Sequence, residues 1–337
     1  MKISMVIGTR PDIIKSYPII NEIQKRGHEL VIIYTGQHYS DNMSGDFFKS
    51  LQVPEPKYKY DKEFDLFETY EFVKDCLQKE MPDFCFVAGD TDTGLVGAFA
   101  SKDMGIVTVH RESGLRSRDR RMHEEKNRIM IDREADIKFV PTKLQKENLK
   151  KEGITDNVYI TGNTISDIVS MFRGQVKKQK MCYDKYYLAT FHRKENVDNF
   201  LVFSNFFNML GKLEKPVMLI KHHYTMTRIK YDIRAYPPKN MMLVEPCTDY
   251  IKMLNLIYNA EMVITDSGGL QEECAILGKK CVVVRKTTDR PETVELGATV
   301  LQNPEETKWV DFKFKRKWKH PYGENVAEKM IDILENF

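Results

Sequence analysis

The chain has 337 residues, 30% of them charged and 42% hydrophobic, and its formal net charge is +3. This length favours two domains, and the composition is typical of a globular protein. The small net charge argues against a nucleic-acid partner, since a basic patch would have to be local to matter. No apolar run has membrane-spanning length, and the start lacks a signal-peptide pattern. We therefore expect a cytoplasmic protein without membrane insertion.

Cysteine and histidine spacing gives no sign of a metal site. The six cysteines form no CxxC pair, and the eight histidines show neither HxxxH nor HExxH spacing. The cysteines are Cys76, Cys85, Cys182, Cys247, Cys274 and Cys281. We expect free, buried thiols that act as small hydrophobic side chains, with no metal and no cofactor. The absence of a GxGxxG fingerprint also argues against NAD.

Short apolar runs alternate with helical patterns along the first half of the chain. The predicted strands are residues 2–8, 29–35, 83–88, 105–110, 137–141 and 157–161. The predicted helices include residues 11–25, 66–79 and 142–152. Most of the strands are continuous apolar runs, as expected of parallel strands that are covered on both faces. The alternation predicts a doubly wound parallel sheet.

A polar, basic stretch at residues 176–185 interrupts this pattern and is typical of an interdomain linker. Strands are then predicted at residues 186–191, 217–221, 241–244, 262–265 and 280–285, and a last helix at 324–337. We predict an α/β fold of two Rossmann-like domains, 1–170 and 171–337, whose parallel sheets face a central cleft. The last helix could pack back on the first domain. Ligands of such sheets bind outside the carboxyl ends of the strands.

A Ser-Gly-Gly turn joins the strand at 262–265 to a helical pattern. Gly268 and Gly269 let the backbone approach a ligand, and the helix N-terminus beyond Ser267 attracts negative charge. This combination suits a diphosphate. The alternative is that Ser267 only caps the helix. Glu273 could accept hydrogen bonds from ribose hydroxyls, or it could be a solvated carboxylate.

A second candidate for phosphate contact follows the first strand. Pro11 fits a first helical position, so Arg10 would project at the strand end. Lys15 lies about one helical turn further on and could share that face. Both cations could neutralise a departing pyrophosphate. The alternative is solvated surface charge.

Four titratable residues are predicted to converge at strand ends. Asp90 and Glu112 directly follow apolar strands, and Glu124 lies in a His-Glu-Glu sequence. His192 ends the first strand of the second domain. Burial and like charge can move a carboxylate pKa toward the working pH, which suits proton transfer. A structural role, such as helix capping, is the alternative for each residue alone.

The chain resembles the UDP-N-acetylglucosamine 2-epimerases over nearly its whole length. The matching positions are 8–11 with 13–15, 35–38 (TGQH), 89–91, His110 with Glu112 and 114–116, 124–125 with 127–128, 141–142, 161–164 (TGNT), 192–193 with 195–196, His222, 265–273, 287–288, 290–292 and Gly297. Single segments are weak signals, but the ordered set, including TDSGG-x-QEE and TT-x-RPE, is highly specific.

This resemblance implies a GT-B-like fold, a homodimer, and a UDP-sugar substrate bound mainly by the second domain. It implies that UDP leaves by anti elimination to give 2-acetamidoglucal, and that readdition inverts C2. Asp90, Glu112 and Glu124 would act in proton transfer, with His192 near the diphosphate. The residues that would bind substrate are Arg10, Lys15, His110, Arg116, His222, Ser267, Gly268, Gly269, Glu273 and Arg290.

The chain departs from the family pattern at three places. Residues 57–67 lack the Gly-rich loop that many bacterial members use for an allosteric substrate molecule, which argues against regulation by UDP-N-acetylglucosamine. Arg111 stands where a valine is usual, and His123 stands where a proline is usual. Arg111 and the arginines of 116–121 raise the hypothesis of an acidic sugar, such as a diacetamido-uronate. The alternative is that they form local salt bridges or a dimer surface. A hydrolysing epimerase, a GT-B glycosyltransferase and a non-catalytic nucleotide-sugar regulator are the other interpretations left open.

Overall fold

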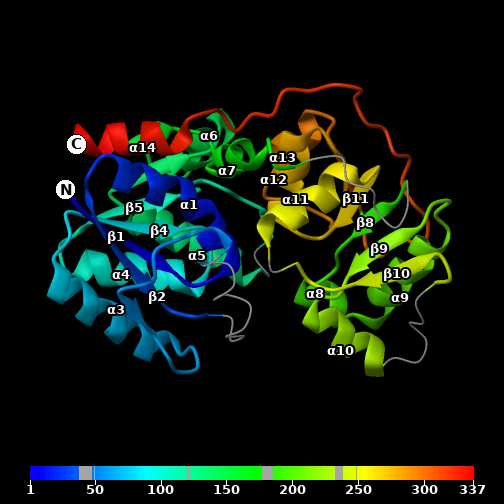
Figure 1. Ribbon diagram of the computed structural model, residues 1–337, viewed down its shortest axis with the longest axis horizontal. Helices are drawn as coiled ribbons and strands as arrows, with labels where there is room; N and C mark the ends of the chain where they lie inside the picture. The colour runs from blue at the N-terminus through cyan, green and yellow to red at the C-terminus, as the bar shows by residue number, and fades with distance from the viewer. Residues whose placement is uncertain (38–47, 49, 120–121, 177–184, 232–237, 248) are drawn as a thin grey trace. The chain divides into compact units, whose positions relative to one another are not determined.

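The computed structural model describes residues 1–37, 48, 50–119, 122–176, 185–231, 238–247 and 249–337. Several sequence features lie outside these residues: His38 of the TGQH match, Cys182, Arg120 and Arg121, and residues 177–184 of the predicted linker. The chain forms two compact units, and Figure 1 traces it from blue at the N-terminus to red at the C-terminus. Unit 1 comprises Met1–Ser170 with Pro321–Phe337, and unit 2 comprises Met171–His320.

A seven-stranded parallel sheet forms the centre of unit 1, in the order β3-β2-β1-β4-β5-β6-β7. Its strands are β1 (Lys2–Ile7), β2 (Glu29–Tyr34), β3 (Tyr58–Lys59), β4 (Phe84–Ala88), β5 (Val107–Arg111), β6 (Ile137–Val140) and β7 (Val158–Ile160). Strands β4 and β6 are buried throughout, as their continuous apolar sequences require.

Helices cover the sheet of unit 1. They are α1 (Arg10–Lys25), α3 (Leu66–Glu80), α4 (Asp92–Asp103), α5 (His123–Glu134), α6 (Lys143–Lys151), α7 (Ile165–Phe172, which crosses the boundary between the units) and α14 (Val326–Glu335). Helix α1 begins with a capping box, in which the side chains of Thr9 and Asp12 satisfy backbone N–H groups. That cap fixes the turn between β1 and α1, where Arg10 lies.

The C-terminal helix α14 packs against α1 within unit 1 (Figure 1). The carboxylate of Asp167 accepts hydrogen bonds from the backbone N–H groups of Val326 at 3.0 Å and Ala327 at 2.8 Å, which caps α14. At the other end of α14, Arg26 pairs with Glu335 at 2.6 Å. Residues 321–337 are therefore held by both ends, and not by packing alone.

Unit 2 contains a six-stranded parallel sheet in the order β10-β9-β8-β11-β12-β13. Its strands are β8 (Tyr187–Ala189), β9 (Val217–Ile220), β10 (Met241–Val244), β11 (Met262–Thr265), β12 (Lys280–Val284) and β13 (Thr299–Gln302). Its helices are α8 (Lys194–Val197), α9 (Phe200–Gly211), α10 (His223–Tyr231), α11 (Tyr250–Asn259), α12 (Gly268–Leu277) and α13 (Pro291–Glu295). Phe191 and Phe206 stack at 4.0 Å in its core.

The predicted strands and the predicted helices of residues 11–25, 66–79, 142–152 and 324–337 are confirmed, with small shifts at their ends. Strands β3 and β13 were not predicted. The five described cysteines are free, and all but Cys247 are buried, as expected. Within the described residues, no helix combines the length and the apolar character needed to cross a membrane.

Gly162 offers a test of how residues 321–337 dock. Its φ is +106°, and a Cβ placed there would lie 2.1 Å from the carbonyl oxygen of Tyr322. We expect Gly162→Ala to lower the free energy of unfolding by at least ~3 kcal/mol, because both the backbone and Tyr322 must shift. Urea denaturation measures the change.

Gly153 provides the matched control, since its φ is +79° and a Cβ added there would meet nothing within 4 Å. Gly153→Ala should cost only the left-handed backbone term of ~1 to 2 kcal/mol. Equal losses in the two variants would contradict the proposed clash with Tyr322.

Candidate functional site

Each sheet has one point where the strand order reverses, and polar residues follow the strands on both sides of it. In unit 1 the reversal lies between β1 and β4, and in unit 2 it lies between β8 and β11. Parallel sheets bind ligands outside the carboxyl ends of the strands at such a point. The residues after these four strands are Gly8–Arg10, Gly89–Asp90, Thr190–His192 and Asp266–Gly268. Each unit therefore has its own candidate edge for a ligand.

Glu112 follows β5 and has an unusual backbone conformation. Its φ is +68°, in the left-handed region that costs a non-glycine residue about 1 to 3 kcal/mol. Its carboxylate is 7% exposed and accepts hydrogen bonds from Lys15 Nζ and, at 2.7 Å, from Asn163 Nδ2. Lys15, on α1, is itself 5% exposed. The turn thus aims a carboxylate at a lysine from another element and holds it there.

Asp90 follows β4 and pairs with Arg128 of α5. Arg128 is 1% exposed and also pairs with Glu125 at 3.2 Å. Glu124, half-buried in the first turn of α5, contributes to the electrostatic field at Arg128. Arg128 therefore pairs with two carboxylates and also experiences the charge of a third, Glu124. Glu125 has a structural role, because it accepts hydrogen bonds from the backbone N–H groups of Ser117 and Arg118, both at 2.8 Å.

His110 is fully buried and supports the turn before Asp90. Its Nε2 lies 3.0 Å from the carbonyl oxygen of Gly89, and its Nδ1 lies 2.7 Å from Asp132 Oδ1. Burial alone would raise the pKa of Asp132, but the charge and hydrogen bond of His110, with the charge of Arg116, outweigh it and hold that pKa at about 2. Both ring nitrogens of His110 thus face oxygen atoms, one on Gly89 and one on Asp132.

The other predicted cations of unit 1 have different surroundings. Arg116 binds Glu152 at 2.8 and 2.6 Å and Asp132 at 2.8 Å, so its guanidinium is engaged locally. Arg10 is half-buried at the start of α1. Arg111 is 2% exposed, and its Nη1 lies 3.5 Å from Thr164 Oγ1. Among the described residues, Arg111 Nη2 is buried without a hydrogen-bond partner.

In unit 2 the carboxylate of Asp266 joins the two strand ends at the reversal point. It is fully buried and accepts hydrogen bonds from the backbone N–H groups of His192 at 3.0 Å and Arg193 at 2.8 Å. The imidazole of His192 lies 3.2 Å from Asp266 Oδ1 and 4.7 Å from the ring of His222. His222 is exposed, and about a third of the His192 side chain is exposed. Two imidazoles are thus presented at this edge.

The Ser-Gly-Gly turn begins α12. Ser267 occupies the N-cap position, yet its side chain makes no capping hydrogen bond, so the capping alternative is not what the structure shows. The guanidinium of Arg290 lies beneath Gly268, where a Cβ would approach its Nη1 to 3.2 Å. Around Gly269 the nearest atom to a Cβ would be Ser267 Oγ at 3.9 Å. The first turn of α12 is therefore open to an anion on one side and supported by Arg290 on the other.

Arg290 is held by an ion-pair network that locks this turn. It pairs with Glu272 at 2.8 Å and with Asp289, and Asp289 also pairs with Arg285 at 2.9 Å. Gln271 donates to the carbonyl oxygen of Arg290 at 3.1 Å. Glu273, two residues beyond Gln271 on α12, is 7% exposed. The network makes Arg290 a support of the turn.

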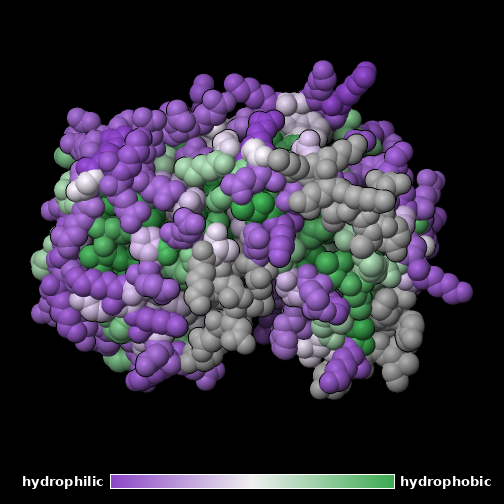
Figure 2. Space-filling model, in the orientation of Figure 1, coloured by the Kyte–Doolittle hydropathy of each residue, from purple (hydrophilic) through white to green (hydrophobic). Residues whose placement is uncertain are grey.

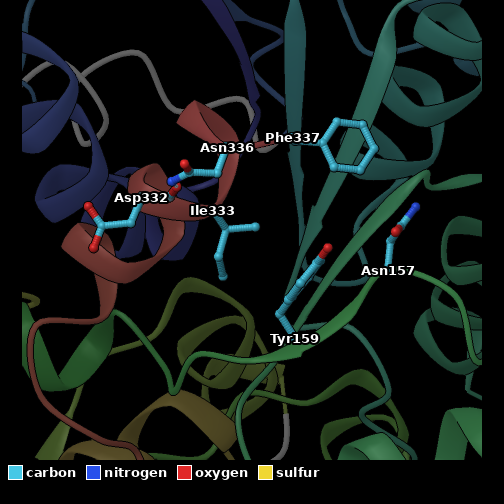
Figure 3. Close-up of a pocket in the computed structure, with 6 residues that line it drawn as sticks. All are labelled: Asn157, Tyr159, Asp332, Ile333, Asn336 and Phe337. Carbon is cyan, nitrogen blue, oxygen red and sulfur yellow. Dashed lines mark hydrogen bonds between the residues drawn. The ribbon is translucent and has the colours of Figure 1, made fainter.

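A pocket of about 400 Å³ in unit 1 lies away from these residues (Figure 3). It is lined by Asn157 and Tyr159 at the start of β7 and by Asp332, Ile333, Asn336 and Phe337 from the C-terminal end of the chain. The start of β7 is at the amino edge of the sheet, whereas the candidate site residues follow carboxyl ends. The pocket contains none of them.

Three residues that the sequence analysis did not assign to the site contribute to it directly. Asn163 holds Glu112, Arg128 joins Asp90 to α5, and Asp266 joins the strand ends of unit 2. All three lie within segments that match the family, so the family match was the sequence signal that could have identified them. Among the described residues, no group of three His, Cys, Asp or Glu side chains could hold a metal ion.

Similarity to known proteins extends over nearly the whole chain. The family model for UDP-N-acetylglucosamine 2-epimerase matches residues 21–335. The UDP-N-acetylglucosamine 2-epimerase of Methanocaldococcus jannaschii is 37% identical over 99% of both chains. A crystal structure of that organism's enzyme, in complex with UDP-GlcNAc and UDP, covers all of both chains with a TM-score of 0.90 and 36% identity.

A further relative is the UDP-2,3-diacetamido-2,3-dideoxy-D-glucuronate 2-epimerase of Pseudomonas aeruginosa. It is 33% identical over 89% of this chain and 88% of its own. The predicted fold class, two α/β domains with parallel sheets of the GT-B-like kind, is confirmed.

The buried Asp132 network should give unit 1 a specific pH dependence. The pKa of Asp132 is lowered from 3.8 to about 2, so its contribution to stability is fully present above about pH 5 and is lost as the pH falls through 3.8 toward about 2. Asp132→Asn should lower the free energy of unfolding by ~3 kcal/mol at neutral pH. The deficit should shrink as the pH is lowered, which urea titrations at several pH values would measure.

Asp75→Asn, at an exposed position on α3, serves as the control and should change stability little at any pH. A deficit for Asp132→Asn that stays constant down to pH 3 would show that the carboxylate charge is not responsible.

Proposed function

The chain belongs to the UDP-N-acetylglucosamine 2-epimerase family, and we propose that it interconverts UDP-N-acetylglucosamine and UDP-N-acetylmannosamine. The support comes from the similarity to the Methanocaldococcus jannaschii enzyme and from the chemistry at the two strand edges. The observation that carries the proposal is the Glu112 carboxylate, which is held in a left-handed turn by Lys15 and Asn163.

Unit 1 supplies the proton chemistry in this proposal. The C2 hydrogen of the sugar is a weak acid, so a positioned carboxylate must remove it while the bond at C1 breaks. Asp90, Glu112 and Glu124 are the candidate bases and acids. Arg128 pairs with Asp90, and Lys15 pairs with Glu112, so each of these two carboxylates is held by a charge-assisted hydrogen bond. His110 is a positioning residue, because it is fully buried and holds the Gly89 carbonyl beside Asp90.

Unit 2 stabilises the leaving group. The open first turn of α12 offers backbone N–H groups and the helix dipole to a diphosphate. His192 and His222 lie together at the neighbouring strand ends and could donate hydrogen bonds to phosphate oxygens. Glu273, on the same helix, would accept hydrogen bonds from ribose hydroxyls. Such preorganised donors lower the barrier to departure of UDP.

The reaction balances without a redox step. A carboxylate takes the C2 proton as the C1–O bond breaks, and the electron pair of the C–H bond forms the C1–C2 double bond of 2-acetamidoglucal. UDP leaves with the electron pair of the C1–O bond. Readdition of UDP at C1, with a proton delivered to the opposite face of C2, gives the epimer.

We expect incubation with UDP-N-acetylglucosamine in D₂O, followed by NMR, to show deuterium at C2 of intact UDP-sugar. Solvent deuterium enters because the abstracted proton exchanges before readdition. Free UDP with N-acetylmannosamine would instead indicate a hydrolysing epimerase. Absence of both exchange and turnover would contradict the epimerase proposal.

In the same assay Glu112→Gln should reduce C2 exchange by at least ~100-fold, the range typical of general acid–base residues. UDP binding should be largely retained, because the proposed contacts of α12, His192 and His222 with the diphosphate do not involve Glu112. Glu147→Gln, at an exposed position on α6, is the matched control and should exchange at the wild-type rate.

Arg111 favours a second candidate substrate, a UDP-diacetamido-uronate. Its buried Nη2 has no hydrogen-bond partner among the described residues, and a sugar carboxylate could supply one. The similarity to the Pseudomonas aeruginosa diacetamido-glucuronate epimerase supports the uronate as a candidate substrate. Asp12 argues against a uronate substrate, because the charge of Arg111 already interacts with this buried carboxylate. Arg116 contributes nothing to this candidate, since Glu152 and Asp132 engage it.

The two candidate substrates can be distinguished by kinetics. Turnover of the neutral and of the uronate UDP-sugar is measured for the wild type and for Arg111→Val. If Arg111 binds a sugar carboxylate, the variant should lose at least ~10-fold in kcat/KM for the uronate, with little change for the neutral sugar. No preference of the wild type for the uronate, or equal losses on both sugars, would contradict this role.

A further inference from the structure

Charge is divided unequally between the two units. Unit 2 contains 26 Lys and Arg against 17 Asp and Glu, whereas unit 1 contains 26 against 32. The small net charge of the whole chain therefore hides a basic unit and an acidic one. A local excess of this kind acts on partners within about a Debye length, which is about 10 Å at 0.1 M salt.

The excess is concentrated in residues 308–319, which we call the basic strip. It contains six cations, Lys308, Lys313, Lys315, Arg316, Lys317 and Lys319, and one anion, Asp311. All six cations are exposed, and Lys313 pairs with Asp311 at 3.2 Å. Among the described residues, the other five form no ion pair. Hydrophilic side chains project along the edge where this orange-to-red segment runs (Figures 1 and 2).

Aromatic residues between the cations anchor the strip to unit 2. Trp309, Phe312 and Phe314 pack against the core of the unit. The indole N–H of Trp309 donates to the carbonyl oxygen of Met209 at 2.8 Å, and that of Trp318 donates to Ala275, also at 2.8 Å. The aromatic side chains thus face inward and the cations outward. The segment holds this arrangement although residues 303–325 contain no helix or strand.

The anchoring points place the strip along the amino edge of the sheet. Ala275 lies near the C-terminal end of α12, and Gly297, whose carbonyl accepts from Lys315 N at 3.0 Å, precedes β13. Lys280, the first residue of β12, lies 5.8 Å from the ring of Phe314. The Ser-Gly-Gly turn is at the opposite end of α12. A partner on the strip would therefore leave the proposed diphosphate site open.

We propose that the basic strip docks unit 2 on an anionic lipid bilayer surface. A row of lysines on an extended segment, at most about 40 Å long, matches a plane of anionic headgroups. Val310, within the strip, is 41% exposed and can contact the interface. A nucleic acid fits less well, because the aromatic rings that would stack on bases face inward and five of the six cations are lysines.

Cosedimentation of the full chain with vesicles tests the proposal. Binding is expected to vesicles of phosphatidylcholine with phosphatidylglycerol and not to phosphatidylcholine alone. It should disappear at about 1 M salt, where the Debye length is about 3 Å. Each cation near an anionic surface contributes about fivefold in partitioning. The variant K313Q/R316Q/K317Q/K319Q should therefore bind at least ~30-fold more weakly, with unchanged turnover of UDP-sugar in solution.

The matched control is K79Q/K143Q/K150Q/K151Q, which removes the same charge from positions on helices α3 and α6 of unit 1. It should bind vesicles like the wild type. Equal weakening in both variants, or no binding to anionic vesicles, would overturn the proposal. Tighter binding to single-stranded DNA than to anionic vesicles at the same salt would also overturn it, in favour of a nucleic-acid partner.

Discussion

A fully buried carboxylate must have its lone pairs satisfied, and this requirement organises the carboxyl edge of both sheets. Asp132 in unit 1 and Asp266 in unit 2 are both 0% exposed. Asp132 gathers donors from residues 110–116, at and after β5, and Asp266 gathers donors from residues 192–196, after β8. Each also contacts a histidine at a strand end, His110 or His192. The cost of leaving either carboxylate unsatisfied fixes the turns on which the candidate site depends.

This organisation explains which part of the site the sequence could predict. Asp90, Glu112, His192 and the Ser-Gly-Gly turn each closely follow a strand, so their place at the carboxyl edge follows from local pattern. Their partners come from elsewhere in the chain. Asn163 is 51 residues from Glu112, and Asp266 is 74 residues from His192. No local signal gives such pairings, and the position of Arg290 beneath Gly268 is likewise set by residues distant in the sequence from α12.

The fold shows the same division. Strands with continuous apolar sequence were predictable, because a strand that is buried on both faces needs apolar residues at successive positions. Strand β3 has only two residues, and β13 is half-buried in its middle, so neither gives a clear pattern. Helix α4 buries Thr93, Ala98, Ala100 and Ser101 among other small residues, and therefore lacks a one-sided apolar stripe. Tertiary packing, and not local preference, defines these elements.

The return of residues 321–337 to unit 1 has a consequence for synthesis. Residues 1–170 of unit 1 are synthesised before unit 2, yet α1 cannot pack against α14, and Asp167 cannot cap it, until residues 321–337 have emerged from the ribosome. Unit 2 lies wholly between these two parts of the chain and can complete its fold earlier. The unit that contains the earlier-synthesised residues is thus the one that completes its fold last, and until then the face of α1 that binds α14 is exposed to solvent.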